Sequence, residues 1–168
     1  MGFAALVPSS FFGLFMTRSS TPKVVIDTNV LLDWLVFDDP DARLVAKAVL
    51  TSQVEWVATA AMREEMERVL TYQWIALRQP DHPGIAAAWA DWAQLHPAPP
   101  PRAPMRCGDS DDQKFIDLAV AVQAQWLLTK DRELLKLAKR ASRQGVQVLR
   151  PAEWTASFAE ATAPQPSN

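Results

Sequence analysis

Short apolar strands that alternate with amphipathic helices predict an α/β fold: a three-layer α/β/α sandwich around a parallel sheet of about five strands. The first observation is the β-branched run at 23–27, which is followed at once by helical periodicity. The same alternation returns around two later apolar runs, at 54–58 and 126–129. The third observation is composition, because 168 residues with 49% hydrophobic and 21% charged residues suit one globular domain.

The elements of the first half follow from periodicity and helix-boundary signals. The Asp-Asp-Pro-Asp run at 38–41 is expected to end one helix and start the next, and Thr59 is expected to cap a third. The predicted elements are a strand at 23–27, helices at 30–37 and 42–51, a strand at 54–58, and helices at 59–72 and 83–95.

The second half begins with a proline-rich connector at 97–101, extended by Pro104, which favours a stiff and extended chain. Gly145 is expected to stop the helix before the last strand. The predicted elements are a short strand at 103–107, a helix at 111–123, a strand at 126–129, a helix at 133–142, a strand at 146–149 and a short helix at 151–158.

Both ends of the chain are expected to lie outside the folded domain, which would span residues 22–158. Residues 1–21 are interpreted as an extension, because their apolar run is too short to cross a bilayer and lacks the flanking residues of a signal peptide. A partner-binding arm and a targeting segment are the alternatives for this extension. Residues 159–168 are expected to form a disordered tail.

Composition also limits the chemistry. The net charge of −2 provides no general basic field, so nucleic-acid binding would need a local basic patch. Cys107 is the only cysteine, which excludes an intrachain disulfide and suits the cytoplasm. With one cysteine and two separated histidines, the usual zinc spacings are absent. Carboxylates would therefore hold any metal, which favours Mg²⁺ or Mn²⁺.

Four acidic side chains are candidates for one site. Asp27 and Asp131 follow strands, and the carboxyl ends of parallel strands meet at one edge of a sheet. At 100° per residue, Asp112 lies on the core-facing stripe of its helix, and Glu65 borders the buried face of the helix at 59–72. Carboxylates held this close repel one another unless a cation lies among them. A magnesium site at this edge is the prediction.

Three of these acids also have a purely structural explanation. Asp27 and Asp131 could each cap the helix that follows. Glu65 could be a boundary residue paired with Arg68 or with a lysine.

Neighbouring acids are expected to play no part in the site. The same helical phase turns Glu64 and Glu67 toward solvent and points Asp117 away from the core. Asp109 and Asp111 are explained by the preference of acids for a helix N-terminus.

Four motifs around these acids resemble those of PIN domains. The run Val24-Val-Ile-Asp-Thr-Asn-Val-Leu31 resembles the opening strand of that family, and Glu65-Met-x-x-Val-Leu70 resembles its second acidic motif. The segments 109–115 and 127–135, with their Asp-x-x-Asp-x-Lys-Phe and Leu-Leu-Thr-Lys-Asp-Arg-Glu-Leu-Leu runs, resemble the third and fourth. The resemblance runs in order over about residues 23–149.

The resemblance implies an RNA-cleaving α/β/α domain that uses Mg²⁺ or Mn²⁺. The branch it resembles most is the VapC-like toxin of bacterial toxin–antitoxin pairs, which implies a small antitoxin partner, a homodimer and a cytoplasmic location without membrane attachment. By position, the implied acidic quartet is Asp27, Glu65, Asp112 and Asp131, and the polar residues that orient it are Asn29 and Thr129.

Basic residues near the fourth motif are candidates for contact with the RNA backbone, although they could equally form the solvated face of an amphipathic helix. They are Lys130, Arg132, Lys136, Lys139, Arg140 and Arg143. Two tryptophans, Trp89 and Trp92, could serve either the core or a dimer or antitoxin interface.

Two other functions remain open at this point. In a phosphoaspartate protein, Asp27 would be the nucleophile, helped by Thr129 and Lys130. A phosphatase of the haloacid type wants a second aspartate two residues on, and Asn29 stands there instead. The other alternative is a non-catalytic interaction module on the same fold.

Overall fold

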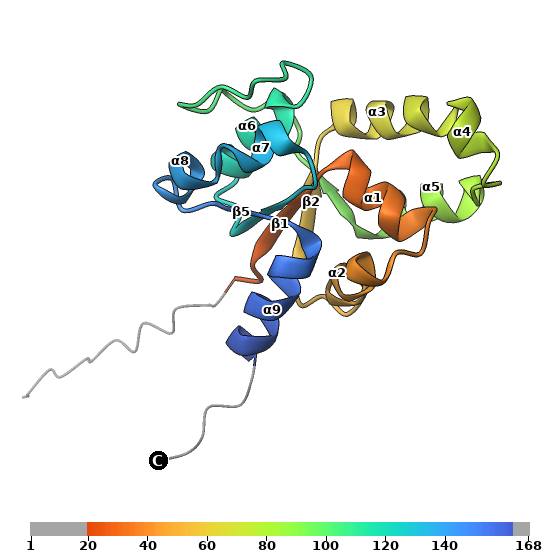
Figure 1. The fold of residues 1–168 in the computed structure, drawn as a ribbon, viewed down its shortest axis with the longest axis horizontal. Helices are drawn as coiled ribbons and strands as arrows, with labels where there is room; N and C mark the ends of the chain where they lie inside the picture. The colour runs from red at the N-terminus through yellow and green to blue at the C-terminus, as the bar shows by residue number, and fades with distance from the viewer. Residues whose placement is uncertain (1–19, 163–168) are drawn as a thin grey trace, which may run out of the picture.

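Five parallel strands form one sheet, with the order β3-β2-β1-β4-β5, in the computed structural model, which describes residues 20–162 (Figure 1). The strands are β1 (Lys23–Ile26), β2 (Glu55–Ala58), β3 (Ala93–Leu95), β4 (Trp126–Leu128) and β5 (Gln147–Leu149). The predicted fold class is confirmed. Residues 1–19 and 163–168, which hold most of the expected extension and the end of the expected tail, lie outside the described residues.

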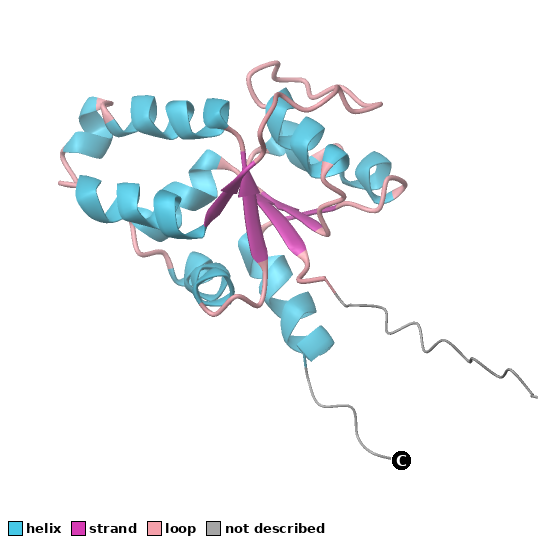
Figure 2. Ribbon diagram, turned by 180° about the vertical axis from the view of Figure 1, so that it is seen from behind, coloured by secondary structure: helices cyan, strands magenta, loops and turns pink. Residues whose placement is uncertain are grey.

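Helices lie on both sides of this sheet (Figure 2). They are α1 (Thr28–Leu35), α2 (Pro40–Leu50), α3 (Ala60–Leu70), α4 (Gln73–Ala76), α5 (His82–Trp92), α6 (Gln113–Ala121), α7 (Arg132–Leu135), α8 (Ala138–Ser142) and α9 (Pro151–Thr162). Helix α6 packs on β1 and β4, α8 packs on β5, and α2 packs between α1 and α9. No helix within residues 20–162 has the length and apolar content needed to cross a bilayer.

The register of the central strands brings their carboxyl ends to one edge. Strand β1 pairs with β4 from Val24 opposite Trp126 to Ile26 opposite Leu128, and it pairs with β2 on its other side. The Asp27 backbone N–H continues this pairing by donating to the Leu128 carbonyl over 2.9 Å. Residues directly after β1, β2 and β4 are therefore neighbours in space although they are far apart in the sequence.

Tryptophans fill the core on both sides of the sheet. The Trp56 ring lies 4.6 Å from the Trp89 ring, centroid to centroid, while Trp126 and Trp154 pack edge to face over 5.7 Å. Trp89 is only 4% exposed, so the interpretation of Trp89 as an interface residue is wrong. The exposed tryptophan is Trp74, which keeps 57% of its surface in solvent.

The predicted helix boundaries around Pro40, Thr59 and Gly145 are confirmed. Asp39 accepts from the Asp41 backbone N–H over 2.9 Å, with Pro40 at the first helical position of α2. The Thr59 hydroxyl accepts from the Met62 N–H, and Gly145 has φ +81°, a left-handed conformation that glycine adopts without strain.

Four predicted elements differ in the structure. The helix expected at 83–95 ends at Trp92, because residues 93–95 form β3. The strand expected at 103–107 is wrong, because the fifth strand is β3, which follows α5 directly and pairs with β2. A three-residue edge strand is too short for periodicity to separate it from the end of a helix. The helix expected at 133–142 is divided into α7 and α8, and α9 continues to Thr162 instead of ending at residue 158.

The segment at 103–107 is instead a loop that packs on α6. Its Met105 side chain is 4% exposed, and the Ala103 N–H donates to Asp117 Oδ1 over 2.8 Å. Gln113 Nε2 donates to the same oxygen over 2.7 Å, and Gln113 Oε1 accepts from the Cys107 N–H. The expectation that Asp117 points away is therefore wrong, because this loop covers it and supplies its hydrogen-bond donors.

We predict that Asp117→Ala lowers the free energy of unfolding by about 2 kcal/mol, because it leaves two donors without an acceptor in a half-buried setting. Urea denaturation followed by circular dichroism measures this change. The matched control is Asp111→Ala, a change at an exposed side chain of the same region, which should alter stability by less than about 0.5 kcal/mol. Equal losses in the two variants would contradict the role given to Asp117.

Candidate active site

Asp27 lies at the carboxyl end of the central strand and is only 3% exposed. Its Oδ2 accepts a hydrogen bond of 2.6 Å from the hydroxyl of Thr129, which follows β4 and is fully buried. Asp27 occupies the position before α1, but its side chain makes no capping hydrogen bond to that helix. Capping therefore does not explain this carboxylate, and the structure brings it together with Thr129 as the sequence predicted.

The setting of Asp27 opposes its negative charge. Burial is the largest influence and raises the pKa of this carboxyl to about 6, and the nearby charges of Glu65 and Asp131 act in the same direction. The hydrogen bonds from the Thr129 hydroxyl and the Thr28 backbone act in the opposite direction and are outweighed. A cation or a proton would therefore be favoured here.

Glu65 extends from α3 to the same edge, and its side chain is 14% exposed. Its Oε1 accepts from the Thr28 hydroxyl over 2.7 Å, and its Oε2 forms an ion pair with the Lys114 ammonium. The ion pair considered from the sequence thus exists, with Lys114 as the partner and not Arg68. Sequence reasoning assigned no role to Thr28 or Lys114, although each lies within two residues of a predicted acid.

The neighbouring glutamates behave as the helical phase predicted. Glu64 is exposed, and Glu67 is exposed and pairs with Arg63 one turn earlier over 3.0 Å. Of the three acids on α3, Glu65 is the one that contacts residues at the sheet edge.

Asp112 lies at the position before α6 and is half-buried, without a capping hydrogen bond from its side chain. Burial is the main cause that raises the pKa of this carboxyl to about 7, followed by the charges of Asp27, Asp131 and Asp109. Lys114 acts in the opposite direction. The charges of Asp27 and Asp131 therefore reach Asp112, as convergence on one edge requires.

Asp131 caps α7, so its structural explanation holds. Its Oδ1 accepts from the backbone N–H groups of Glu133 and Leu134 over 2.8 and 3.2 Å. Its own N–H donates to the Thr129 hydroxyl over 2.9 Å, which ties the capping turn to Asp27 through one side chain. Both capping bonds end on Oδ1, so Oδ2 is left for another ligand.

Asn29 joins the two loops that carry Asp27 and Asp131. Its Oδ1 accepts from the Lys130 backbone N–H over 3.3 Å. This contact holds the start of α1 against the turn after β4, and it is the structural counterpart of the orienting role expected for Asn29.

The acids suit a hard cation in chemistry and charge. Their oxygens are the ligands that Mg²⁺ and Mn²⁺ prefer, and mutual repulsion among them is what a divalent ion would relieve. Within residues 20–162, however, no three acidic, histidine or cysteine side chains are placed so that together they could hold a metal ion. Glu65 is paired with Lys114 instead, and Asp131 caps its helix.

Several of the basic candidates have partners. Lys130 Nζ forms a 2.5 Å ion pair with Asp33, an acid on α1 that sequence reasoning did not single out. Lys136 pairs with Glu133 over 2.5 Å, and Arg140 donates to the Arg106 carbonyl over 3.2 Å. Among the residues that the structure describes, Arg132, Lys139 and Arg143 are exposed and have neither an ion pair nor a side-chain hydrogen bond.

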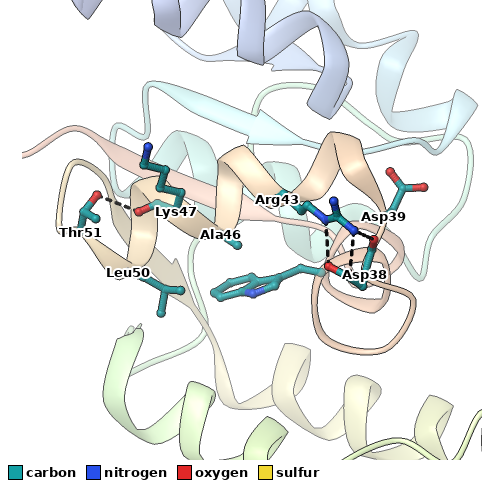
Figure 3. Close-up of a pocket in the computed structure, with 8 residues that line it drawn as sticks. Asp38, Asp39, Arg43, Ala46, Lys47, Leu50 and Thr51 are labelled. Atoms are coloured by element: carbon teal, nitrogen blue, oxygen red, sulfur yellow. Dashed lines mark hydrogen bonds and ion pairs between the residues drawn. The ribbon is translucent and has the colours of Figure 1, made fainter.

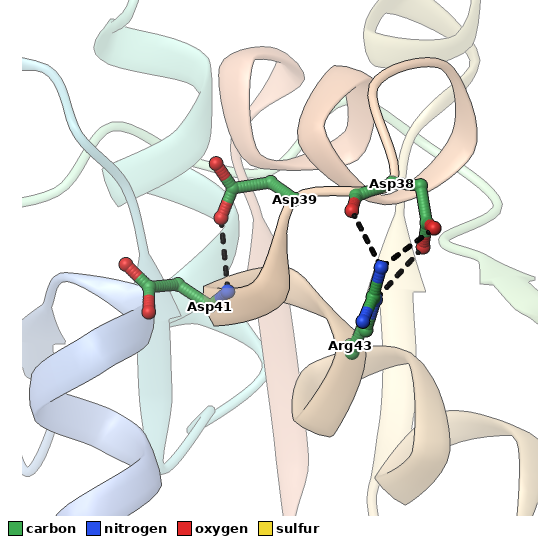
Figure 4. Close-up of polar contacts among 4 residues, drawn as sticks. All are labelled: Asp38, Asp39, Asp41 and Arg43. Atoms are coloured by element: carbon green, nitrogen blue, oxygen red, sulfur yellow. Dashed lines mark hydrogen bonds and ion pairs between the residues drawn. The ribbon is translucent and has the colours of Figure 1, made fainter.

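A pocket of about 440 Å³ between α1 and α2 lies away from these acids (Figure 3). Its lining includes Trp34, Leu50 and an exposed ion pair of 2.8 Å between Arg43 and Asp38. In Figure 4 the Arg43 guanidinium points at Asp38 while Asp39 turns to the start of α2. Arg43 and Asp38 neutralise one another there, and none of the four candidate acids lines this pocket.

The comparison with protein families agrees with the motifs. The family profile described as PIN domain matches residues 23–133, well over half of the chain. A chain in the crystal structure of VapBC2 from Rickettsia felis, bound to a DNA fragment from their promoter, is 10% identical, with a TM-score of 0.51 over 76% of this chain and 98% of that one. The T. brucei RRP44 PIN domain is 13% identical, with a TM-score of 0.43 over 91% and 93%. No curated protein shows significant sequence similarity.

We predict that Asp112→Asn raises the melting temperature by a few degrees at pH 8 in EDTA, because it removes a charge that burial and three acids oppose. The pKa of Asp112 lies above its ordinary value of 3.8, so its contribution to stability is fully present below 3.8 and is lost as the pH rises through about 7. The advantage of the variant should therefore shrink as the pH is lowered toward about 4.

Thermal unfolding of both proteins across this pH range, with EDTA and with Mg²⁺, provides the measurement. Mg²⁺ should stabilise the unsubstituted protein more than the variant, because binding to the native state adds stability. A variant that melts lower in EDTA, with equal shifts by Mg²⁺, would make Asp112 a structural residue.

Proposed function

The chain belongs to the PIN domain family, and from this premise we propose that it is a metal-dependent endoribonuclease. The observation that supports the proposal is that acids from four separate segments influence one another: the charges of Glu65 and Asp131 raise the pKa of Asp27, and those of Asp27 and Asp131 raise the pKa of Asp112. These acids are Asp27, Glu65, Asp112 and Asp131. Asp27 is the centre of the arrangement, because it is buried, does not cap its helix, and lies within reach of the charges of the other three.

The residues of the chain would hold and orient the reacting groups. A bound Mg²⁺ or Mn²⁺ ion would neutralise charge on the phosphodiester and activate water. Asp27, fixed by the Thr129 hydroxyl, would be the central ligand, and Asp112 and the free oxygen of Asp131 would complete the acidic set. The Thr28 hydroxyl would keep Glu65 aimed at the same place.

Lys114 would exchange partners when the site is loaded. Its ammonium pairs with Glu65 and also donates to the Asp111 carbonyl. A phosphate oxygen of the substrate would offer this ammonium a charge-assisted hydrogen bond in place of Glu65. Lys114 would then contact RNA beside the cleaved bond, in addition to the exposed basic residues Arg132, Lys139 and Arg143.

The finer proposal is that the protein is the toxin of a type II toxin–antitoxin pair. It is supported by the resemblance of the four motifs to the VapC-like branch and by the similarity in fold to a chain of VapBC2. Such a protein would act in the cytoplasm on RNA, would form a homodimer, and would be silenced by a small cognate antitoxin.

A non-catalytic interaction module on the same fold is the second candidate, and the Glu65–Lys114 ion pair favours it, because a site that satisfies its own charges needs no ion. Isothermal titration with Mn²⁺ separates the two. Binding that is lost in Asp27→Asn supports the nuclease, and absence of carboxylate-dependent binding supports the module.

We predict that the purified protein cleaves RNA only with Mg²⁺ or Mn²⁺ and leaves a 5′-phosphate. Glu65→Gln should lower the rate by more than about 100-fold, because it removes a charge from the metal-binding edge. Glu64→Gln is the matched control on the same helix and should keep the rate, because Glu64 is exposed. Full cleavage in excess EDTA, or equal losses in the two variants with the fold intact, would contradict the proposal.

We predict that expression of the chain without an antitoxin arrests growth of a bacterial host and degrades RNA, while Asp27→Asn does neither. Growth curves and RNA integrity are measured together after induction. Arrest by both forms would place toxicity outside the acidic site. Cleavage in vitro without growth arrest would reject the toxin assignment and leave the ribonuclease proposal intact.

A further inference from the structure

A second pocket adjoins the acidic edge and has no role in the site described above. It encloses about 260 Å³ between the start of α3, the proline-rich connector and α6. Its lining includes Thr59, Ala60, His96, Pro99, Lys114 and Asp117. Lys114 and Ala61 also line a shallow groove of about 350 Å³ that contains Glu65, so the pocket adjoins the part of the acidic edge where Glu65 lies.

One wall of the pocket is held in place by hydrogen bonds. The His96 backbone N–H donates to the Ala58 carbonyl over 2.8 Å, which extends the pairing of β3 with β2. The His96 ring Nδ1 forms a 2.5 Å hydrogen bond with the Ala98 carbonyl. A carbonyl only accepts, so Nδ1 donates, and this bond fixes the orientation of the imidazole. The pyrrolidine rings at 97, 99 and 100 continue the wall with little freedom to move.

The pocket also offers a buried acceptor and a donor. Asp117 is 8% exposed, and both of its hydrogen bonds, from Ala103 and Gln113, end on Oδ1. Its Oδ2 has no hydrogen-bond partner within residues 20–162 and can accept from a ligand. The Lys114 ammonium uses two of its three N–H groups, on Glu65 and on the Asp111 carbonyl, and keeps one to donate.

We propose that this pocket binds one unpaired base of an RNA strand, next to the phosphodiester bond that the acidic edge cleaves. The proposal rests on the nuclease function proposed above. A base has flat apolar faces that suit the imidazole and proline wall, and its edge carries the N–H and carbonyl or ring-nitrogen groups that suit Asp117 and Lys114. The buried carboxylate of Asp117 disfavours a phosphate at the same place, because two anions would be desolvated together.

The occupant must come from single-stranded RNA. Its base has to leave any helical stack to enter a pocket whose wall and carboxylate surround it, while its phosphate stays in the groove beside Glu65. The pocket would thereby select where the chain is cut, because only a strand with a suitable base beside the bond would be held in position.

Filling the pocket tests this proposal without touching the acids. Ala60 is the first residue of α3, is exposed, and lines the pocket but not the groove beside Glu65. Ala60→Phe places a ring where the base would lie. Ala87→Phe is the matched control, because Ala87 is an exposed alanine on α5 that lines neither the pocket nor the groove. Thermal unfolding verifies that both variants fold, and His96→Ala, which removes part of the wall, replaces Ala60→Phe if that variant does not.

The first measurement is the cleavage profile of a randomised single-stranded RNA pool with Mg²⁺. The unsubstituted protein should prefer certain bases at one position beside the cleaved bond by about tenfold, equivalent to about 1.4 kcal/mol. Ala60→Phe should lose this preference while it still cleaves, and Ala87→Phe should keep it. A preference that survives in Ala60→Phe, or cleavage by the unsubstituted protein without any preference, overturns the proposal.

The second measurement separates the pocket from catalysis. Binding of fluorescein-labelled ten-nucleotide single-stranded RNAs to Asp27→Asn with Mg²⁺ is followed by polarisation. Adding Ala60→Phe should weaken binding about tenfold, whereas adding Ala87→Phe should not. If the unsubstituted protein does not cleave but the Ala60 effect on binding persists, the nuclease function fails and the base pocket stands. If neither assay responds to Ala60→Phe, or if duplex RNA competes as well as a single strand, the base pocket is wrong.

Discussion

The buried carboxylate of Asp27 at the end of the central strand is the constraint on which the rest of the site depends. Residues 24–26 place it there, because a strand that is paired on both sides and covered on both faces delivers its last side chain into a desolvated position. Burial of a carboxylate is costly unless partners compensate, and the Thr129 hydroxyl compensates only in part, since the pKa remains near 6. The negative charge of Asp27 is therefore not fully compensated by the residues around it, and a cation or a proton would stabilise it.

The other three acids differ in how the protein stabilises their charge. One carboxylate oxygen of Asp131 caps its own helix, and Glu65 forms an ion pair with Lys114. These two of the four acids are therefore stabilised without a bound ion. The Asp112 carboxylate has no hydrogen bond or ion pair with any residue that the structure describes, and its pKa of about 7 lies above the value of about 6 for Asp27. Part of the edge therefore stabilises the fold, and part of it is available to bind a ligand. For this reason the four acids can differ in their effect on stability while they share a proposed role in chemistry.

The sequence predicts a residue's position correctly where the periodicity of its own helix or strand determines that position. Helical phase separated Glu65 from Glu64, and the strand-to-acid junction located Asp27 beside Thr129. The prediction fails where a distant segment supplies the partner. Helical phase alone points Asp117 away from the core, because nothing in α6 reveals the loop that packs over it. Lys114 gives no local signal, because its partner lies on α3, far away in the sequence. A three-residue edge strand such as β3 is too short to show a strand periodicity in the sequence.

For the proline-rich connector, composition predicts the stiffness of the segment but not the residues against which it packs. Its stiffness was evident from the prolines, but stiffness alone describes a spacer as well as a wall. The hydrogen bonds of Ala103 to Asp117 and of Cys107 to Gln113 hold it against α6, and His96 anchors its other end to β2. A stiff segment fixed at both ends cannot adapt its shape to whatever enters beside it. The proline-rich connector is therefore a rigid segment without secondary structure that lies next to the acidic edge. At that place it would select among substrates.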